Sequence, residues 1–318
     1  MVLNKVYAVC SILITIISSC LCSAVIYISY HMYKHNRKLE YTFIMAFNAV
    51  VDMLYSLVFS VPIMSSISVN YKLYILIENP WMQRISTFSL RLLIMLQGVM
   101  ALAIAACNAV HFYYRYRMLC KEDAWSKTKY TAVYMVIMVY IFVAGLNFSF
   151  GGYDQTAESV EEVSKELPMG SLVPRHLVID QKQPMFYLVI FSIELLFLAE
   201  YGVIIFCGIR IVQKMRQRLG LKLVSSTRKV QRYVVKVMIL QALYPLLVYF
   251  IPIIFATALL AMGTGFRNVS CVVRFTMQLL SALNCISVLI LIPAYRNAIF
   301  SGSSGRGDVV GSEDENLQ

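Results

Sequence analysis

Residues 92–117 read LLIMLQGVMALAIAACNAVHFYYRYR, a long apolar run that closes with aromatic and basic side chains. Between Leu92 and Tyr114 this stretch contains no Asp, Glu, Lys or Arg. A helix needs about 20 predominantly apolar residues to cross the hydrocarbon core of a bilayer. The stretch therefore predicts a membrane-spanning helix that ends at an aqueous interface, where Tyr and Arg side chains are favoured.

The composition of the whole chain also indicates a membrane protein. Hydrophobic residues make up 59% of the 318 residues and charged residues 14%, whereas a soluble domain carries about 25% charged residues. So few charges cannot cover a water-soluble core of this size. The net charge of +11 suits an anionic membrane surface, and no compact soluble module is present to bind nucleic acid. We therefore predict the lipid bilayer as a partner and no nucleic acid.

Seven stretches qualify as spanning helices, so the predicted fold class is an all-α membrane protein with a seven-transmembrane helix bundle. The first stretch is too long for the apolar region of a signal peptide and lacks an A-x-A-like cleavage site, so we interpret it as a span. The spans together make one predicted domain, residues 1–300, followed by a tail, 301–318, whose Gly, Ser and acidic content predicts disorder. The predicted spans are residues 6–30, 41–68, 85–113, 130–150, 185–209, 232–262 and 269–293.

The basic residues alternate between the connecting segments and so predict the orientation of the bundle. Counted with the adjoining helix ends, 19 of the 28 Lys and Arg residues fall after spans one, three, five and seven, and 8 fall in the opposite set. Lys and Arg favour the cytoplasmic side. The N-terminus is therefore predicted outside and the C-terminus inside. The segment 210–236, with nine basic residues and no acid, then faces the cytoplasm.

The long outer segment, residues 151–184, is compatible with two interpretations. Val160, Val163 and Leu167 recur at helical spacing, and Ser159 with Glu162 resembles a capping box. These features predict a short amphipathic helix over the mouth of the bundle. A solvated loop remains the alternative.

Ionisable groups inside a span cost about 2.5–3.5 kcal/mol each on insertion scales and therefore call for an explanation. Arg91 of the third span and Glu194 of the fifth lie at similar predicted depths below the outer surface. They either line a ligand pocket or form a structural ion pair. Arg274 lies near the outer end of the seventh span, where a long basic side chain can reach the interface. The ionisable residues within the spans are Asp52, Arg91, His111, Glu194, Glu200, Lys236 and Arg274.

The inner half of the bundle contains a second group of polar residues at matching predicted depths. Asp52 of the second span and Asn284 of the seventh, near Ser287, are expected to form a polar network with Asn108 of the third span. A buried network of this kind can stabilise two helix arrangements; a purely structural carboxyl is the alternative. Pro245 in the sixth span predicts a kink, because proline removes a backbone hydrogen bond.

Signatures of enzymes are missing from the sequence. It contains no HExxH, GxSxG, P-loop or GxGxxG pattern. His31 and His35 are four residues apart without a third local ligand, and the eight cysteines show no metal-type pair or secreted disulfide framework. We predict no catalytic residues, no metal site and no cofactor.

Three motifs carry a family resemblance. HFYYRYRMLC ends the third span, RKVQRYVVKVMILQALYPLLVYFIPIIF includes the sixth, and LILIPAYRNAIF closes the seventh. In this order and spacing they resemble the nematode serpentine chemoreceptors of the Str superfamily, which are G-protein-coupled receptors with seven spans. The likeness extends through Phe300. Departures from the family pattern are Tyr114, where an acid usually precedes the arginine, and the inserted Ala294.

The resemblance implies a receptor of the plasma membrane, and often of sensory cilia, that signals through a heterotrimeric G protein. A small-molecule or short-peptide ligand would bind in the outer half of the bundle. Residues 151–184 contain no cysteine, so the usual disulfide from the third span to this loop cannot form. The predicted ligand-binding residues are Arg91, Glu194, Tyr187, Tyr249 and Arg274. The residues predicted for switching and G-protein coupling are Arg115, Tyr116, Asp52, Asn284, Pro245, Tyr295 and Arg296.

Two other classes of protein remain as alternatives. A seven-helix ligand-gated channel like those of insects would require the opposite orientation, which the distribution of basic residues disfavours. A transporter would be expected to contain inverted repeats or paired broken helices, and no internal repeat is evident in the sequence.

Overall fold

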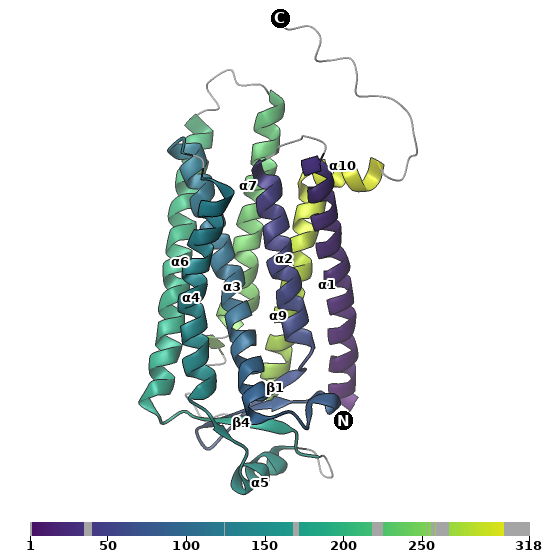
Figure 1. Cartoon of the computed structure of the whole chain (residues 1–318), viewed down its shortest axis with the longest axis vertical. Helices are drawn as coiled ribbons and strands as arrows, with labels where there is room; N and C mark the ends of the chain where they lie inside the picture. Colours follow the sequence, from purple (N-terminus) through teal and green to yellow (C-terminus); the bar gives the residue numbers. More distant parts are fainter. Residues whose placement is uncertain are drawn as a thin grey trace, which may run out of the picture.

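The chain forms a bundle of long helices, with a small β-sheet lying across one end of it (Figure 1). The computed structural model describes residues 2–34, 40–123, 125–167, 172–217, 225–252, 254–255, 258 and 267–301. The long helices are α1 (Val2–Lys34), α2 (Glu40–Ser60), α3 (Thr87–Cys120), α4 (Lys127–Phe150), α6 (Pro184–Gln217), α7 (Ser225–Pro245) and α9 (Arg267–Leu291).

Membrane crossing accounts for the length and composition of these helices. Six of the described helices are long and apolar enough to span a bilayer, and α7 together with the turn that follows it contains a shorter apolar segment, Val235–Val248, which we assign to the remaining crossing. The apolar window of α3 is 72% buried, against 22% for those of α1, α4 and α6. Helix α3 therefore occupies the middle of the bundle, while α1, α4 and α6 present apolar side chains outward, as lipid contact requires.

Several predicted spans differ from the observed helices. The prediction of one helix over 41–68 was wrong beyond Ser60, because the chain turns there into a β-strand. Helices α3 and α6 continue past the predicted ends at 113 and 209, since an α-helix can extend beyond the bilayer into water. Part of the predicted sixth span, 232–262, lies outside the described residues.

The sheet contains four antiparallel strands in the order β1-β2-β4-β3. A two-residue turn joins β1 and β2, and both of its residues, Asn70 and Tyr71, have positive φ angles of 51° and 61°. This conformation matches the type I′ turn, whose twist suits a hairpin. The strands are β1 (Met64–Val69), β2 (Lys72–Ile77), β3 (Tyr153–Asp154) and β4 (Arg175–Asp180), and a short 3₁₀ helix, η1 (Pro80–Met82), follows β2.

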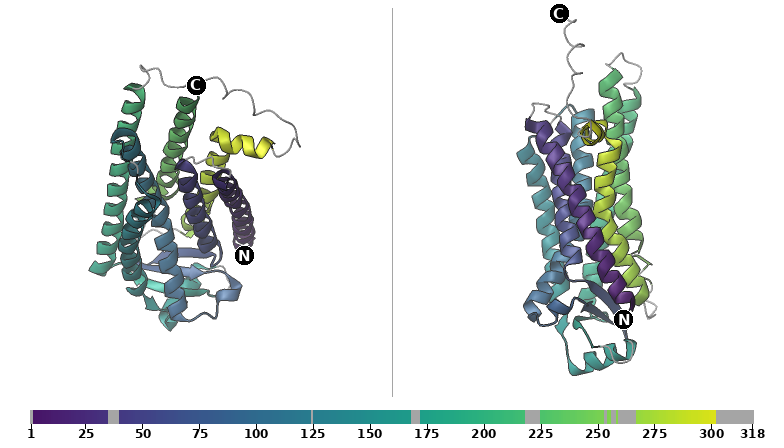
Figure 2. Two further views of the ribbon diagram at one scale, coloured as in Figure 1. Left: turned by 45° about the horizontal axis from the view of Figure 1, so that its top comes forward. Right: turned by 90° about the vertical axis from the view of Figure 1, so that its right-hand side faces the viewer.

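Both faces of the sheet are covered. Leu73, Ile75 and Ile77 alternate along β2 and pack with Leu90 and Ile94 of α3. The residues between them, Tyr74 and Leu76, pack on the other face against Val163 of helix α5 (Ala157–Glu166). This alternation is the two-residue period of a β-strand. We call the sheet together with α5 the lid, and both views in Figure 2 place it across the end of the bundle.

The amphipathic helix predicted within 151–184 is confirmed as α5, but its predicted start was wrong. Thr156 caps the helix: its hydroxyl accepts from the Ser159 backbone N–H, and the Ser159 hydroxyl accepts from the Thr156 backbone N–H. Ser159 therefore occupies the N3 position of the capping box, and Thr156, not Ser159, is the N-cap residue. Val163 is fully buried and Leu167 packs beside it, which is why their helical spacing was informative.

The opposite end of the bundle carries a short helix, α10 (Pro293–Ser301), which lies across the axis of α9 (Figure 1). Helix α1 begins at the lid end, so the described chain starts and finishes at opposite ends of the bundle, as an odd number of crossings requires. Ser301, predicted to begin the disordered tail, is the last residue of α10, and the rest of that tail lies outside the described residues.

Candidate functional site: the lid contacts and a buried polar stripe

Arg274 joins the lid to the helix bundle. Its guanidinium donates to the side-chain oxygen of Gln97 on α3, at 3.1 Å, and to the hydroxyl of Ser66 on β1, at 3.0 Å. Gln97 is buried and also donates to the Val58 carbonyl of α2. One arginine therefore bridges strand β1 and helix α3, and any ligand that competes for its hydrogen bonds would alter both contacts.

Two further basic residues attach the lid to α3 and α4. The Arg91 guanidinium donates to the Gly152 carbonyl at 2.9 Å and lies 5.6 Å from the centre of the Phe150 ring. Arg175 on β4 forms an ion pair with Asp154 on β3, at 2.9 Å, and donates to the Thr87 hydroxyl at the start of α3. These contacts hold the lid without a cysteine.

The outer surface of the lid has its own charged cluster. Lys72 lies 2.9 Å from the Glu158 carboxylate and 3.2 Å from that of Glu162. The Tyr74 hydroxyl donates to Glu162. The hydrogen bonds from Tyr74 and Lys72 lower the pKa of Glu162, and the bond to Glu158 raises the pKa of Lys72. Helix α5 is thereby joined to β2 through charged groups as well as through its apolar face.

The structure does not bring Arg91 and Glu194 together. Arg91 is occupied by Gly152 and Phe150, and no ion pair joins it to Glu194 although both side chains are described. Glu194 is half-buried on α6. The structural ion pair, one of the two alternatives, is therefore not formed between these described side chains, because similar depth along two helices does not determine which way the side chains point. The other alternative, that Arg91 and Glu194 line a ligand pocket, stays a prediction.

Two predicted ligand-binding tyrosines lie away from the Arg274 bridge. Tyr187 is 57% exposed on α6 and contacts the ring of Phe186 edge-on. An exposed side chain in the first turn of α6 faces the surroundings of the bundle rather than its interior. Tyr249 belongs to the π-helical turn η3 (Leu246–Phe250), and its side chain lies outside the described part of the chain.

The predicted pairing of Asp52 and Asn284 is confirmed. The Asn284 side-chain amide donates to the Asp52 carboxylate at 2.9 Å, and both side chains are buried. Asn108 borders the same small cavity, of about 10 Å³, which is about one water in size. Its own amide donates to the Gln241 carbonyl of α7, at 2.9 Å, so Asn108 connects the network to the sixth crossing.

Asn284 belongs to a stripe of polar side chains along one face of α9. Its members are spaced three or four residues apart, the spacing of one helix face, and contact the lid, α3, α2, α1 and α7 in turn. Gln278 donates to the Phe59 carbonyl, Ser281 lies 3.5 Å from the Cys22 sulfur, and Ser287 lies 2.9 Å from the Tyr244 hydroxyl. We call this set the α9 stripe: Arg274, Gln278, Ser281, Asn284 and Ser287.

Pro245 marks an irregular turn, as its position predicts. Helix α7 ends at Pro245 and continues as the π-helical turn η3, after which the Ile251 backbone N–H bonds to the Leu246 carbonyl. Proline supplies no N–H, so the regular ladder cannot pass through it. The Tyr201 hydroxyl of α6 donates to the Ala242 carbonyl at 2.9 Å, three residues before Pro245.

Arg115 lies inside the bundle instead of at its surface. Helix α3 continues to Cys120, and the Arg115 side chain is only 5% exposed. Tyr116 is half-buried and meets the Phe206 ring of α6 edge-on, with ring centres 5.6 Å apart. The helix itself runs more than one further turn, to Cys120, and the prediction that Arg115 lies at the cytoplasmic end of the span stays a prediction. Contact between Arg115 and a partner requires the surrounding helices to separate.

The Tyr295 hydroxyl lies 2.7 Å from that of Ser29 on α1, and both side chains are buried. This hydrogen bond attaches α10 to the bundle immediately after α9 ends. Arg296, the next residue, is exposed on α10. Of the two neighbours in the PAYR motif, the tyrosine is therefore structural and the arginine is accessible.

The prediction from the sequence did not include Ser66, Gln97 and Gln278. The first two are the hydrogen-bond partners of Arg274, and Gln278 is a member of the α9 stripe. A partial signal for the lid was present: residues 66–69 alternate polar and apolar side chains and precede Asn70, a residue favoured in hairpin turns. The apolar content of the same stretch favoured a longer second span instead. No signal in the sequence singled out Gln97, because one glutamine in an apolar helix has no periodic pattern.

The comparisons with known proteins agree with this architecture. A solved structure, the crystal structure of squid rhodopsin, is similar to the chain with a TM-score of 0.62 and 15% sequence identity, covering 94% of this chain and 85% of that one. At this identity the likeness shows the fold alone. A search of the curated proteins found no match.

A family model described as the serpentine type 7TM GPCR chemoreceptor Str matches residues 7–169 and 178–300, which cover all or most of each described helix. The family and the fold are of the receptor type, and the chain is a multi-pass membrane protein. The motifs that end the third and seventh crossings both lie within the matched residues. The chain therefore belongs to the Str family of serpentine seven-transmembrane chemoreceptors.

Proposed function

We propose that the protein is a chemosensory receptor that binds a small external ligand beneath the lid and activates a heterotrimeric G protein. The α9 stripe carries this proposal, because it connects the Arg274 bridge at the lid to the Asp52–Asn284 pair in the inner half. Residues 1–300 would form the receptor domain. By family resemblance, the receptor would reside in the plasma membrane and in sensory cilia.

Binding would act first on Arg274. Ser66 and Gln97 are neutral partners, so a ligand with a hydrogen-bond acceptor can replace either one at the guanidinium. Loss of the Ser66 bond would release α9 from β1, and loss of the Gln97 bond would release it from α3. Either change would shift a pre-existing equilibrium between helix arrangements. Arg91 and Glu194 would then influence ligand response through the lid and α6 rather than as a pair.

The response at the inner end would require the bundle to open. Arg115 is buried in this conformer, and α7 contains the irregular turn at Pro245 that can serve as a pivot. Movement of α7 would expose Arg115 beside Tyr116 and the basic segment 210–236. Arg296 on α10 is already accessible and would join the same surface.

A reporter cell line that reads G-protein dissociation, screened with chemical panels, tests the proposal. Arg274→Gln is expected to shift the potency of an active compound at least tenfold with unchanged maximal response. Arg115→Ala is expected to abolish the response while surface expression and ligand binding persist. Arg117→Ala serves as the matched control, because Arg117 pairs with Asp123 at the end of the same helix and its loss should leave the response intact.

A compound that binds and produces an ion current or substrate flux without G-protein dissociation would contradict the proposal. Such a result would favour the channel or transporter class. Glycosylation tags on the two termini provide an independent check, because an N-terminus inside the cell is incompatible with G-protein coupling through residues 210–236.

A further inference from the structure

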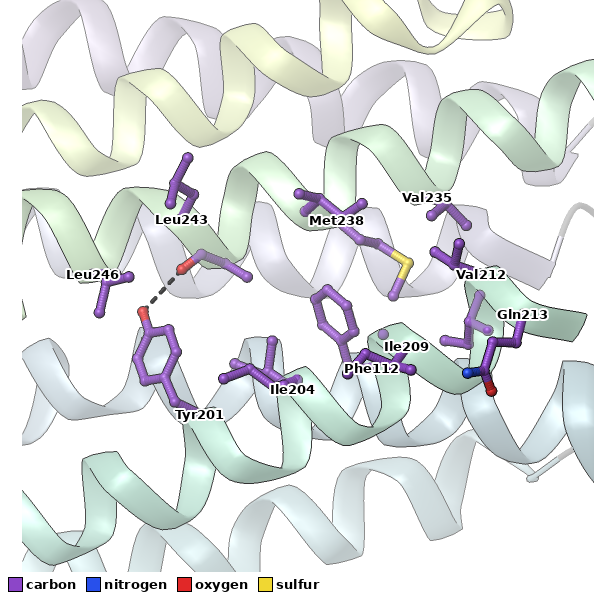
Figure 3. A pocket seen from close by; sticks show the side chains of 15 residues that line it. Phe112, Tyr201, Ile204, Ile209, Val212, Gln213, Val235, Met238, Leu243 and Leu246 are labelled. Carbon is purple, nitrogen blue, oxygen red and sulfur yellow. Dashed lines mark hydrogen bonds between the residues drawn. The ribbon is translucent and has the colours of Figure 1, made fainter. Parts of the chain in front are cut away.

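An open apolar groove runs between α6 and α7 on the side of the bundle. Its volume is about 570 Å³, and its lining extends from Tyr201 to Gln213 on α6, from Val235 to Leu243 on α7, and to Leu246 at the start of η3. Figure 3 shows side chains of the two helices on either side of the groove, with Phe112 of α3 between them. The Tyr201–Ala242 hydrogen bond closes one end.

The groove faces the surroundings of the bundle. Its floor is buried, with Phe112 at 3% and Met238 at 1% exposure, whereas its rims at Ile205 and Ile209 are 58% and 53% exposed. The candidate membrane span Pro184–Met215 includes the α6 side of the groove, and the shorter apolar segment Val235–Val248 includes the opposite side. The surroundings are therefore lipid hydrocarbon, so the occupant has to be apolar along the length of the groove.

The dimensions suit a narrow chain better than the whole body of a second helix. Twelve residues separate the two ends on α6, which corresponds to roughly 18 Å at ~1.5 Å per residue. A helix is about 10–12 Å wide, so a segment of this length would fill roughly 1,400 Å³ or more, well above the volume of the groove. The length is instead close to the depth of one leaflet, about half of a ~30 Å hydrocarbon core. A single lipid chain fits this space.

The ends of the groove differ in charge. Three basic residues are close in sequence to the Gln213 and Val235 end of the lining: Lys214 follows Gln213 and Arg210 lies three residues before it on α6, and Lys236 follows Val235 on α7. The segment 210–236 contains no acidic residue. The other end is closed by Tyr201, whose hydroxyl is already bonded. An anionic headgroup is therefore favoured at the basic end, since juxtamembrane Lys and Arg attract the acidic lipids of the cytoplasmic leaflet.

We propose that this groove is a binding site for one acyl chain of an anionic phospholipid, with its headgroup held by Arg210, Lys214 and Lys236. Hydrocarbon in the bilayer is as apolar as the groove, so the hydrophobic effect does not drive the chain into it. Packing against Phe112 and Met238 and the charge at the basic end supply the selectivity. The bound chain separates α6 from α7 below the Tyr201–Ala242 bond. The proposal requires neither a chemosensory ligand nor a G protein.

Gly208 offers a way to fill the groove from within. A Cβ at this position would meet the Phe112 ring at 3.5 Å, an ordinary contact, so Gly208→Leu would place its side chain in the space without backbone strain. Gly202 lies on the same helix outside the lining, and a Cβ there meets nothing within 4 Å. Gly202→Leu is the matched control. Leu243→Trp fills the groove from α7, where the side chain is already 41% exposed.

The test uses the full chain in lipid nanodiscs that contain phosphatidylserine with a photoreactive group in one acyl chain. Labelling is expected to concentrate in peptides covering 201–213 and 235–246. It should fall at least fivefold in Gly208→Leu and Leu243→Trp and remain unchanged in Gly202→Leu. The equivalent phosphatidylcholine should label at least fivefold less, and replacing Arg210, Lys214 and Lys236 by Gln should remove that difference.

Three results would overturn the proposal. Equal labelling of α1 and α4 would show ordinary lipid contact without a site. Unchanged labelling in both filling variants would place the lipid elsewhere. Equal labelling by the two phospholipids, or displacement by a sterol, would assign the groove to a different occupant. Each variant is compared at equal recovery of monomeric protein, and the two filling variants on different helices separate loss of the site from a local folding defect.

Discussion

Asn284 donates a 2.9 Å hydrogen bond to Asp52 across the centre of the bundle, between two helices that are far apart in sequence. Asp52 and Asn284 are each only 3% exposed. A buried polar group that loses its partner costs about 1–3 kcal/mol, so this pair holds α2 and α9 at a defined separation. The contact between these two residues is the one that their matching depths in the sequence predict, and their role in switching stays a prediction.

Exchanging the two residues tests the pair directly. Asn284→Asp is expected to lower the thermal unfolding midpoint, because it places two carboxyl groups at hydrogen-bond distance in a buried site. Adding Asp52→Asn restores an amide beside a carboxylate and should recover most of the loss. Midpoints of purified protein in one detergent provide the measurement. A double variant no more stable than Asn284→Asp would show that the pair does not contribute as described.

The Tyr295–Ser29 hydrogen bond predicts a measurable coupling between α10 and α1. Tyr295→Phe and Ser29→Ala should each destabilise the protein by about 1 kcal/mol, the usual net value of such a bond. The double variant should lose no more than either single one, because both remove the same bond. Tyr30→Phe, at a 63% exposed position of α1, is the control and should be neutral. Strictly additive losses would contradict the coupling.

The close approach of α3 and α4 depends on Gly145. A Cβ there would lie 2.9 Å from Val99 Cγ2 and 3.3 Å from Met95 Cγ. Gly145→Ala is therefore expected to destabilise the protein by about 1–3 kcal/mol through overpacking. Gly98→Ala, where a Cβ meets nothing within 4 Å, should stabilise it slightly because alanine favours a helix. Thermal unfolding compares the two, and equal effects would refute the packing argument.

His176 makes the lid sensitive to acid. Burial lowers its pKa below the ordinary 6.5, and the nearby Arg175 adds to the shift, while the Pro174 carbonyl and Asp154 oppose it. The folded state favours the neutral ring, which lies 2.9 Å from both the Ser159 hydroxyl and the Pro174 carbonyl. Its stabilisation is complete above pH 6.5 and declines as the pH falls below that value, because the unfolded state then binds more protons.

Hydrogen exchange of the β4 amides, corrected for intrinsic rates, checks this prediction. Exchange in Arg175–Asp180 should accelerate between pH 7 and pH 5.5 while that of α3 stays constant. His176→Gln should remove the pH dependence in this window, although its exchange at pH 7 will be faster. Glu162 also has a lowered pKa, but its effect begins below the ordinary value of 4.5 and so lies outside the window.

Much of the helical framework could be predicted from the sequence, because hydrophobicity over about 20 residues has few other structural explanations. Asp52 and Asn284 could be paired because their depths match and buried polar groups require partners. The same reasoning failed for Arg91 and Glu194, since Arg91 found a backbone carbonyl and an aromatic ring instead. Depth follows from residue spacing, whereas the rotation of a helix about its axis depends on packing that no local pattern encodes.

The pairing of the lid strands was beyond prediction for a different reason. Strands β2 and β4 come from segments far apart in the chain, so their pairing is a long-range contact. The register runs from Lys72 opposite Asp180 to Ile77 opposite Arg175. Local patterns indicate that a strand can form but not which segment will pair with it. Arg115 illustrates a third limit, which is that sequence alone does not show whether a charged side chain is buried. The tyrosines and arginines at the end of the apolar run predicted exposure at an interface, yet the helix continues to Cys120 and the Arg115 side chain is buried.

The lid also constrains how the polypeptide matures. Strands β1 and β2 leave the ribosome with the second and third crossings, but the edge of β2 stays unpaired until Arg175–Asp180 has been synthesised. An unpaired edge attracts other chains, so this interval is when the nascent protein most needs a chaperone. Neither 61–86 nor 151–183 contains a cysteine; closure of the outer end is accordingly independent of oxidising conditions and should proceed unchanged in a reducing cell-free system.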